Sequence, residues 1–218
     1  MNLYISEAIA FVRARLDEIS QSASDMVVDT VDDRNLDMTV EKLLPEAIED
    51  VHIAAPASLL EGSVFSSGNA GPFSKSQEDG IIDIDFRSPA QGSFDVLRLV
   101  WFKCSGGILT STTFPEDSPE GRIQLNKYIQ GQPDEPVIVR QADGADFRPH
   151  YKYYTTKQDD ADFSICVFPV PAKATDTTGG YFFVSSQLKT TTLNRLTAKV
   201  LIAYGDAQRA QAFMQTTK

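Results

Sequence analysis

The chain is poor in the residues that most often carry chemistry. Its 218 residues include two cysteines and two histidines. These residues, Cys104, Cys166, His52 and His150, are scattered singly, whereas a zinc site draws its ligands from closely spaced pairs. Both cysteines lie in strand-like apolar segments, which favours buried free thiols over a disulfide. The sequence therefore predicts no metal site and no cofactor.

Basic clusters and long apolar runs are also missing. Thirty acidic residues against twenty basic ones give a formal net charge of −10. This balance speaks against tight DNA binding, because proteins that grip phosphates carry a basic face. No apolar run approaches the ~20 residues of a membrane span. The N-terminal sequence MNLYISEAIAFVRARLDEI interleaves charges with its apolar residues, unlike a signal peptide. We expect a protein made in the cytoplasm that makes no membrane contact.

Catalytic motifs are absent as well. The chain has no Walker, GxGxxG or GxSxG pattern. Asp83 and Asp85 share one face of a predicted strand, as a glycosidase pair or a metal site would require. A solvated strand face explains them more simply, and His52 is expected as a helix histidine satisfied by a hydrogen bond. We predict no catalytic residue, and an enzyme that uses Asp83 and Asp85 is the least favoured alternative.

Hydrophobic periodicity predicts helices at both ends of the chain. Apolar residues recur at three- and four-residue spacing over 5–19 and over 36–51. Pro45 interrupts the second stripe, so we expect a bend there or a helix that restarts with Pro45 in its first turn. A last helical region begins near Thr191. Gly205, followed by Asp206, predicts a break before a further short helix.

The apolar stripes of these helices are predicted to pack in the core or between subunits. The residues assigned to this role are Ile9, Val12, Leu16, Leu43, Leu44, Ile48, Leu196, Val200 and Leu201.

Between the helical ends the chain has the pattern of short β-strands separated by turns. The predicted strands are 81–86, 94–102, 108–113, 137–140, 148–155, 163–170 and 181–185. Ser118 followed by Pro119 predicts the start of a short helix. The fold class is therefore α+β. We expect a helical core from 1–61 and 187–218, a Gly- and Ser-rich linker over 62–77, and a β-rich inserted domain over 78–186.

The helical ends resemble one structural family. The segment YISEAIAFVRARLDEI, followed by NLDMTVEKLLPEAIEDVHIAAP, resembles the paired helices that open the head–tail connector, or ring, proteins of tailed phages. The segment LNRLTAKVLIAYGDAQRAQAFM is similar to the closing helix of the same proteins, with a small-residue YGDA turn. Ring proteins of crAss-like and related Bacteroides phages look most alike. The match covers roughly the first 60 and the last 30 residues, and the β-rich middle departs from the small all-helical connectors.

The resemblance implies a structural protein of the virion, located at the head–tail junction. Copies would form a closed ring, twelve-fold in the family, that contacts the portal protein and other tail or ring proteins. Genomic DNA would pass through the ring without sequence-specific contact. The same charge that speaks against DNA binding would suit the lining of such a passage.

A second interpretation belongs to a different class of protein. Trp101 and the Tyr151–Tyr154 cluster would let a β module with helical flanks bind a carbohydrate or a protein through exposed aromatic rings. Alternating aromatic residues are also what a half-buried strand prefers. Exposed rings would favour the binding module, and buried rings would remove its predicted site.

Overall fold

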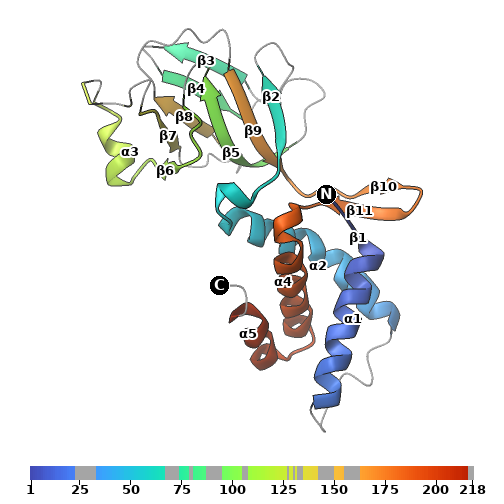
Figure 1. The fold of residues 1–218 in the computed structure, drawn as a ribbon. Coiled ribbons are helices and arrows are strands. Elements are labelled where there is room, and N and C mark those ends of the chain that lie inside the picture. Colours follow the sequence, from blue (N-terminus) through green and yellow to red (C-terminus); the bar gives the residue numbers. More distant parts are fainter. Residues whose placement is uncertain are drawn as a thin grey trace. The chain divides into compact units, whose positions relative to one another are not determined.

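The structure is a computed structural model, and it divides the chain into two compact units. The first consists of Met1–Glu61 together with Pro171–Lys218, and the second of Gly62–Val170. Both helices and sheets are present, which confirms the α+β class (Figure 1). The residues that the structure describes are 1–22, 33–66, 74–78, 81–86, 95–104, 108–126, 128–129, 131, 135–141, 150–154 and 163–215.

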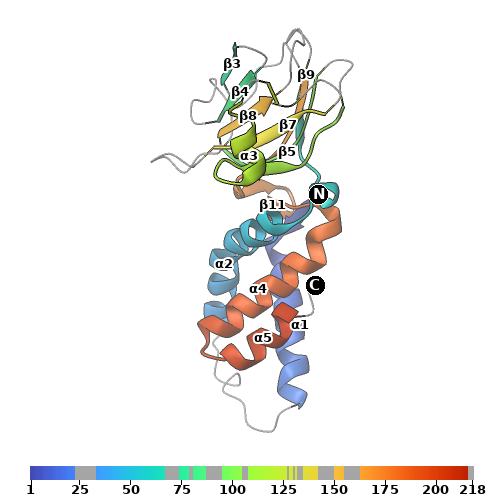
Figure 2. The same ribbon diagram turned by 90° about the vertical axis from the view of Figure 1, so that its left-hand side faces the viewer.

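The first unit is mainly helical. Helix α2 packs against both α1 and α4, and α5 packs against α4 (Figure 2). Its helices are α1 (Ile5–Ser22), α2 (Asp33–Ala54), α4 (Lys189–Ala203) and α5 (Ala207–Gln215), with short 3₁₀ turns at Ala57–Leu59 and Ser186–Leu188. Because the apolar stripes face inward, burial of each large aliphatic side chain contributes about 1.5–3 kcal/mol to folding.

A small antiparallel sheet completes the helical unit. Its strands lie in the order β1 (Asn2–Tyr4), β11 (Gly179–Phe183), β10 (Ala174–Asp176). In the register of this sheet, Leu3 lies opposite Phe182, and both side chains are buried. The helical prediction for the N-terminal end missed β1. The predicted β-rich domain over 78–186 extended too far, because pairing with β1 places β11 and β10 in the helical unit.

The second unit contains two sheets. One has the order β2-β9-β5, and the other β3-β4-β8-β7-β6, in which β6 and β7 are parallel (Figure 1). The strands are β2 (Ser63–Ser66), β3 (Ser74–Glu78), β4 (Ile81–Asp85), β5 (Val96–Cys104), β6 (Thr113–Pro115), β7 (Val137–Arg140), β8 (His150–Tyr154) and β9 (Phe163–Pro169), and the short helix α3 spans Pro119–Ile123.

The two sheets of this unit share one hydrophobic core. Alternate residues of β4 and β8, such as Ile82 and Tyr153, point to the same side and meet residues of β5 and β9. Phe102 and Phe163 stack with ring centroids 5.6 Å apart and an interplanar angle of 8°. Strand periodicity of two explains this pattern, because every second residue faces the opposing sheet.

Several local predictions are met and others are corrected. Gly205 adopts a φ of +86° and separates α4 from α5, which confirms the predicted break. Ser118 caps α3 by accepting a hydrogen bond from the Gly121 N–H, with Pro119 as the first helical residue. Helix α2 runs through Pro45 without a restart. The predicted linker over 62–77 contains β2 and the beginning of β3 instead.

Candidate functional site

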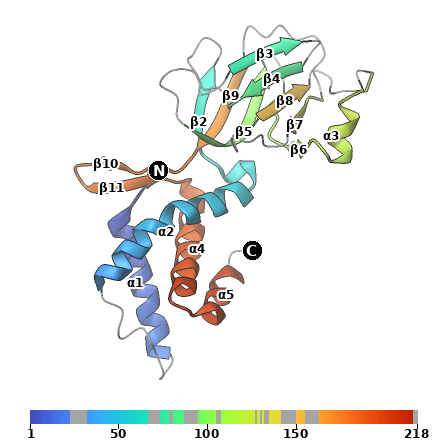
Figure 3. The same ribbon diagram turned by 180° about the vertical axis from the view of Figure 1, so that it is seen from behind.

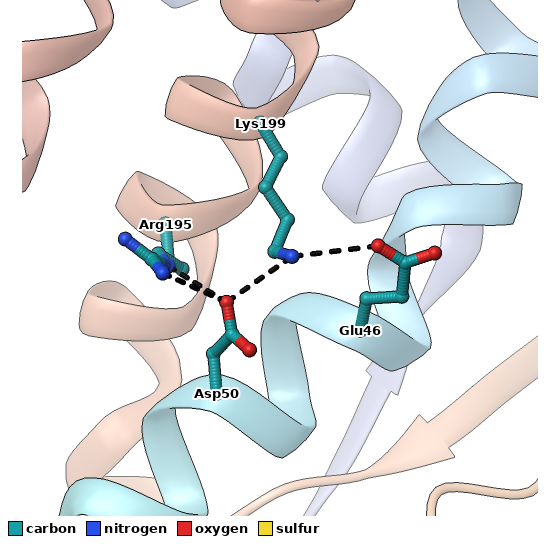
Figure 4. A network of polar contacts seen from close by, with 4 residues as sticks. All are labelled: Glu46, Asp50, Arg195 and Lys199. Carbon is teal, nitrogen blue, oxygen red and sulfur yellow. Dashed lines mark hydrogen bonds and ion pairs between the residues drawn. The ribbon is translucent and has the colours of Figure 1, made fainter.

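A polar network fixes the register of α2 against α4. Arg195 donates to Asp50 Oδ2 from Nε at 3.0 Å and from Nη2 at 2.8 Å. Lys199 Nζ lies 3.1 Å from the same oxygen and 3.4 Å from Glu46 Oε2 (Figure 4). Asp50 and Glu46 are one helical turn apart, and so are Arg195 and Lys199. Glu46 meets Lys199 and Asp50 meets Arg195, so the two helices run in opposite directions where the charges pair.

Both cations shift the ionisation of Asp50. Partial burial raises the pKa of its carboxyl, but the hydrogen bonds and charges of Lys199 and Arg195 lower it by more. The net result is a pKa below the ordinary aspartate value of 3.8. The carboxylate therefore stays charged, and the network stays paired, at any pH near neutrality.

A second contact ties the end of α2 to the turn before α4. His52 is completely buried. Its Nδ1 lies 2.8 Å from the Ile48 carbonyl oxygen, and its Nε2 lies 3.0 Å from the Ser185 backbone nitrogen. The geometry requires a neutral ring in which Nδ1–H donates to Ile48 while Nε2 accepts from the Ser185 N–H. Burial lowers the pKa of His52, since the charged ring would lose its hydration.

A groove lies beside this network within the helical unit. Its volume is about 430 Å³, and its wall is mainly aliphatic, with the Asp50–Arg195 ion pair at one side. The residues that line it are Asp50, Val51, Ala54, Ala55, Pro56, Leu59, Leu188, Thr191 and Arg195. The one acid in this wall is already paired, so the groove offers a packing surface and no free catalytic base.

The predicted packing residues lie in the interior of the helical unit. Val12, Leu16, Leu44, Ile48, Leu196, Val200 and Leu201 are buried within the subunit, whereas Ile9 and Leu43 are half-buried. Leu44 and Leu201 belong to this buried group. Because each is at most 1% exposed in the single chain, an aspartate there would unfold the subunit before it could report on assembly.

The aromatic cluster of the binding-module interpretation is not on the surface. Tyr151, Tyr153 and Tyr154 are each at most 3% exposed, and Trp101 is half-buried. The Tyr151 hydroxyl accepts a hydrogen bond from the Leu99 N–H at 3.3 Å, inside the core. These rings pack the β unit, so the binding-module interpretation loses the aromatic surface on which it depended.

Asp83 and Asp85 lie beside His150 and Lys152 of the neighbouring strand. Asp83 contacts His150 Nε2 directly, and it lies opposite Lys152 in the register of β4 and β8. Asp85 lies opposite His150. Among the residues that the structure describes, no group of three histidine, cysteine or acidic side chains could hold a metal ion. On this face of the sheet Asp83 and Lys152 form a cross-strand pair of opposite charges, which favours strand pairing.

The cysteine prediction can be examined at one of the two positions. Cys166 is a buried free thiol on β9, and burial raises its pKa to about 11. The thiol is therefore almost fully protonated and unreactive near neutral pH. The side chain of Cys104 lies outside the described residues.

An exposed apolar patch on the β unit is the feature that the sequence prediction missed. We call Ile123, Leu125, Tyr128 and Ile129, on α3 and the turns after it, the α3 patch. Leu125 and Tyr128 are 73% and 82% exposed, and Ile123 and Ile129 about half exposed. Apolar groups gathered in this way mark interaction surfaces more often than single exposed side chains do. In the sequence these four residues fit a helical period only moderately, which was the available signal.

Comparison with known proteins identified no relative of the chain. No protein-family model matches the chain, and no curated protein matches it significantly. Within the described part of the chain, no helix is long and apolar enough to cross a membrane.

Proposed function

We propose that the protein is a structural component of a phage virion that forms a ring between portal and tail. Copies of the chain assemble into a closed ring of about twelve subunits, the number that the resemblance implies. The ring binds the portal protein on one side and other tail or ring proteins on the other, and genomic DNA passes through it.

One observation carries the proposal. The two segments that resemble connector proteins lie at opposite ends of the sequence, yet α1, α2, α4 and α5 fold into one unit. The α2–α4 pairing joins these segments through Asp50, Arg195 and Lys199. A chance likeness in two separate amphipathic helices would not require them to be partners.

Charge and exposed surface agree with a passive role in the virion. A formal net charge of −10 would repel DNA phosphates and let the duplex slide past without sticking. The α3 patch supplies an apolar surface for a neighbouring virion protein, as the inserted β unit of a connector would need.

The first test is the sequence of the DNA that flanks the gene. Reading frames for a portal, a terminase and a major capsid protein within a few genes would support the proposal. A neighbourhood of polysaccharide-utilisation or metabolic genes would contradict it.

The second test measures assembly directly. Native mass spectrometry and electron microscopy of the purified chain, alone and with the neighbouring portal protein, should show closed rings that bind the portal. Replacing Leu125 and Tyr128 together by serine should weaken binding to a virion partner and leave the far-UV spectrum unchanged, because both side chains are exposed. Replacing the exposed Glu120 by serine is the control. A chain that stays monomeric with and without the portal would refute the ring.

A further inference from the structure

The three-stranded sheet of the helical unit has two open edges. Its order is β1-β11-β10, and within the described residues no strand pairs with the outer side of β1 or of β10 (Figure 3). An unpaired edge presents backbone N–H and C=O groups that can bind another strand. The two edges belong to different strands, so they are not equivalent surfaces.

The hydrogen bonds between β1 and β11 show which groups point outward from β1. Met1 and Val184 exchange both bonds: the Val184 N–H donates to Met1 O at 2.9 Å, and Met1 N donates to Val184 O at 2.7 Å. In an antiparallel ladder the next pair makes no such bonds. That pair is Asn2 and Phe183. The N–H and C=O of Asn2 are therefore directed away from β11, and Asn2 is exposed.

The same alternation identifies the outward residue of β10. Along β11 the backbone hydrogen bonds of successive residues alternate between β1 and β10. Phe182 therefore bonds to β1, and Tyr181 bonds to β10, where it lies opposite Ala174. Thr175 then lies in the pair without bonds, opposite Gly180. Its N–H and C=O point outward, and the residue is exposed.

We infer that the Asn2 edge of β1 pairs with the Thr175 edge of β10 in a neighbouring copy of this chain. Both strands are antiparallel to β11 and hence parallel to each other. A subunit related by a small rotation would therefore add its β10 beside β1 as a parallel pair, and the sheet would continue from copy to copy.

This contact has the symmetry that a ring needs. Two different surfaces meet, so the interface is heterologous, and repetition of a heterologous contact closes when the rotation divides a full turn. Pairing of β10 with a second β10 would instead give a two-fold dimer. The inference rests on the proposed ring, and it names the backbone edges that join its subunits.

A proline substitution tests the inference. Thr175→Pro removes the outward N–H from an exposed edge residue, a position at which sheets tolerate proline. Thr177→Pro is the matched control, because it makes the same change in the adjoining turn, outside β10. The protein concentration at which half of the Thr175→Pro chains are assembled should be up to about tenfold higher, the factor expected from losing one backbone hydrogen bond. Thr177→Pro should assemble like the wild type, and both variants should keep its melting temperature.

Disulfide trapping gives a second readout that does not depend on proline. Asn2→Cys and Ala174→Cys are combined in a Cys104→Ser background, in which the buried Cys166 stays unreactive, and Thr175→Cys is made alone in the same background. In a parallel pair the Thr175 N–H can bond to Asn2 O when Ala174 faces Asn2, and the side chains of these two facing residues lie on the same side of the sheet. Facing residues on neighbouring strands lie within the ~4.4–6.8 Å between Cα atoms that a disulfide spans. Mild oxidation of the double variant should give a ladder of covalent oligomers, whereas each single variant should stay monomeric under denaturing conditions.

The outcomes separate the two proposals. The edge pairing would be overturned, and the ring would stand, if the wild type forms rings and Thr175→Pro assembles at the same concentration. Rings in which the double cysteine variant forms no cross-link between β1 and β10 would have the same meaning. Dimers from Thr175→Cys alone would also overturn the edge pairing, because they would show two-fold pairing of β10. Failure of the wild type to assemble, alone or on the portal, would refute the ring and the edge pairing with it.

Discussion

Replacement of His52 should remove both a structural bridge and a pH dependence from the helical unit. The ring of His52 links Ile48 on α2 to the Ser185 backbone N–H, and it does so only when neutral. The variant His52→Leu keeps an apolar side chain in a site that is completely buried. It leaves the Ser185 N–H without its partner. Such an orphaned buried donor costs about 1–3 kcal/mol, which is the expected loss at pH 7.5.

Acidification should weaken the wild type and spare the variant. Burial lowers the pKa of His52 below its ordinary 6.5, so the unfolded chain takes up the proton first. The stability that depends on the neutral ring is complete above pH 6.5 and is lost as the pH falls toward the lowered pKa. The free energy of unfolding should decrease across this window, with a slope of up to about 1.4 kcal/mol per pH unit.

Two optical signals make the measurement specific for each unit. Urea unfolding followed by circular dichroism at 222 nm reports the helical unit, whereas the fluorescence of Trp101 reports the β unit that contains it. We expect the difference in unfolding free energy between wild type and His52→Leu to shrink from pH 7.5 to pH 5.0, in the helical signal only. His150→Gln is the control, since His150 lies in the other unit. Equal pH slopes in wild type and His52→Leu would refute the reasoning.

Three further substitutions probe packing and backbone geometry through urea-unfolding free energies. Leu44→Ala should cost about 3–5 kcal/mol because it opens a cavity in the helical core, whereas Met38→Ala, at 65% exposure on the same helix, should stay within about 0.5 kcal/mol. Thr192→Val should stabilise the protein by about 1 kcal/mol, because the buried Thr192 hydroxyl has no hydrogen-bond partner among the described residues. A loss of stability would contradict this. Gly205→Ala should cost about 1 kcal/mol through its φ of +86° alone, since no atom lies within 4 Å of the added Cβ.

Local chemistry explains why some elements could be predicted from the sequence. Ser118 and Pro119 start α3 through a side-chain cap and a fixed φ, and both effects act within one turn. Gly205 separates α4 from α5 because its conformation favours glycine, and the following Asp206 accepts from the Arg209 N–H at 3.1 Å. The helix stripes likewise follow from residues three and four apart.

Other features depend on partners distant in the sequence. Strand β1 has three residues and forms because β11, some 180 positions later, pairs with it, so no local pattern marks it. Pro45 is a local helix breaker, yet α2 continues through it because tertiary packing on both sides holds the helix. His52 was expected as a satisfied helix histidine, but its partner Ser185 could be identified only from the fold.

Ion pairs on the helical unit bear on how its helices are aligned with one another. Lys189 pairs with Glu7, Lys173 with Glu41, Arg13 with Asp37, and Arg195 and Lys199 with Asp50. Each pair has at least one side chain more than a third exposed, and such pairs contribute about 0–1 kcal/mol. Their energy is therefore minor beside that of the buried aliphatic residues. Aliphatic stripes, however, tolerate sliding by one turn, whereas opposite charges on facing helices do not. The charges thus select the register in which the α1, α2 and α4 stripes meet. The chain as a whole remains acidic, with a formal net charge of −10.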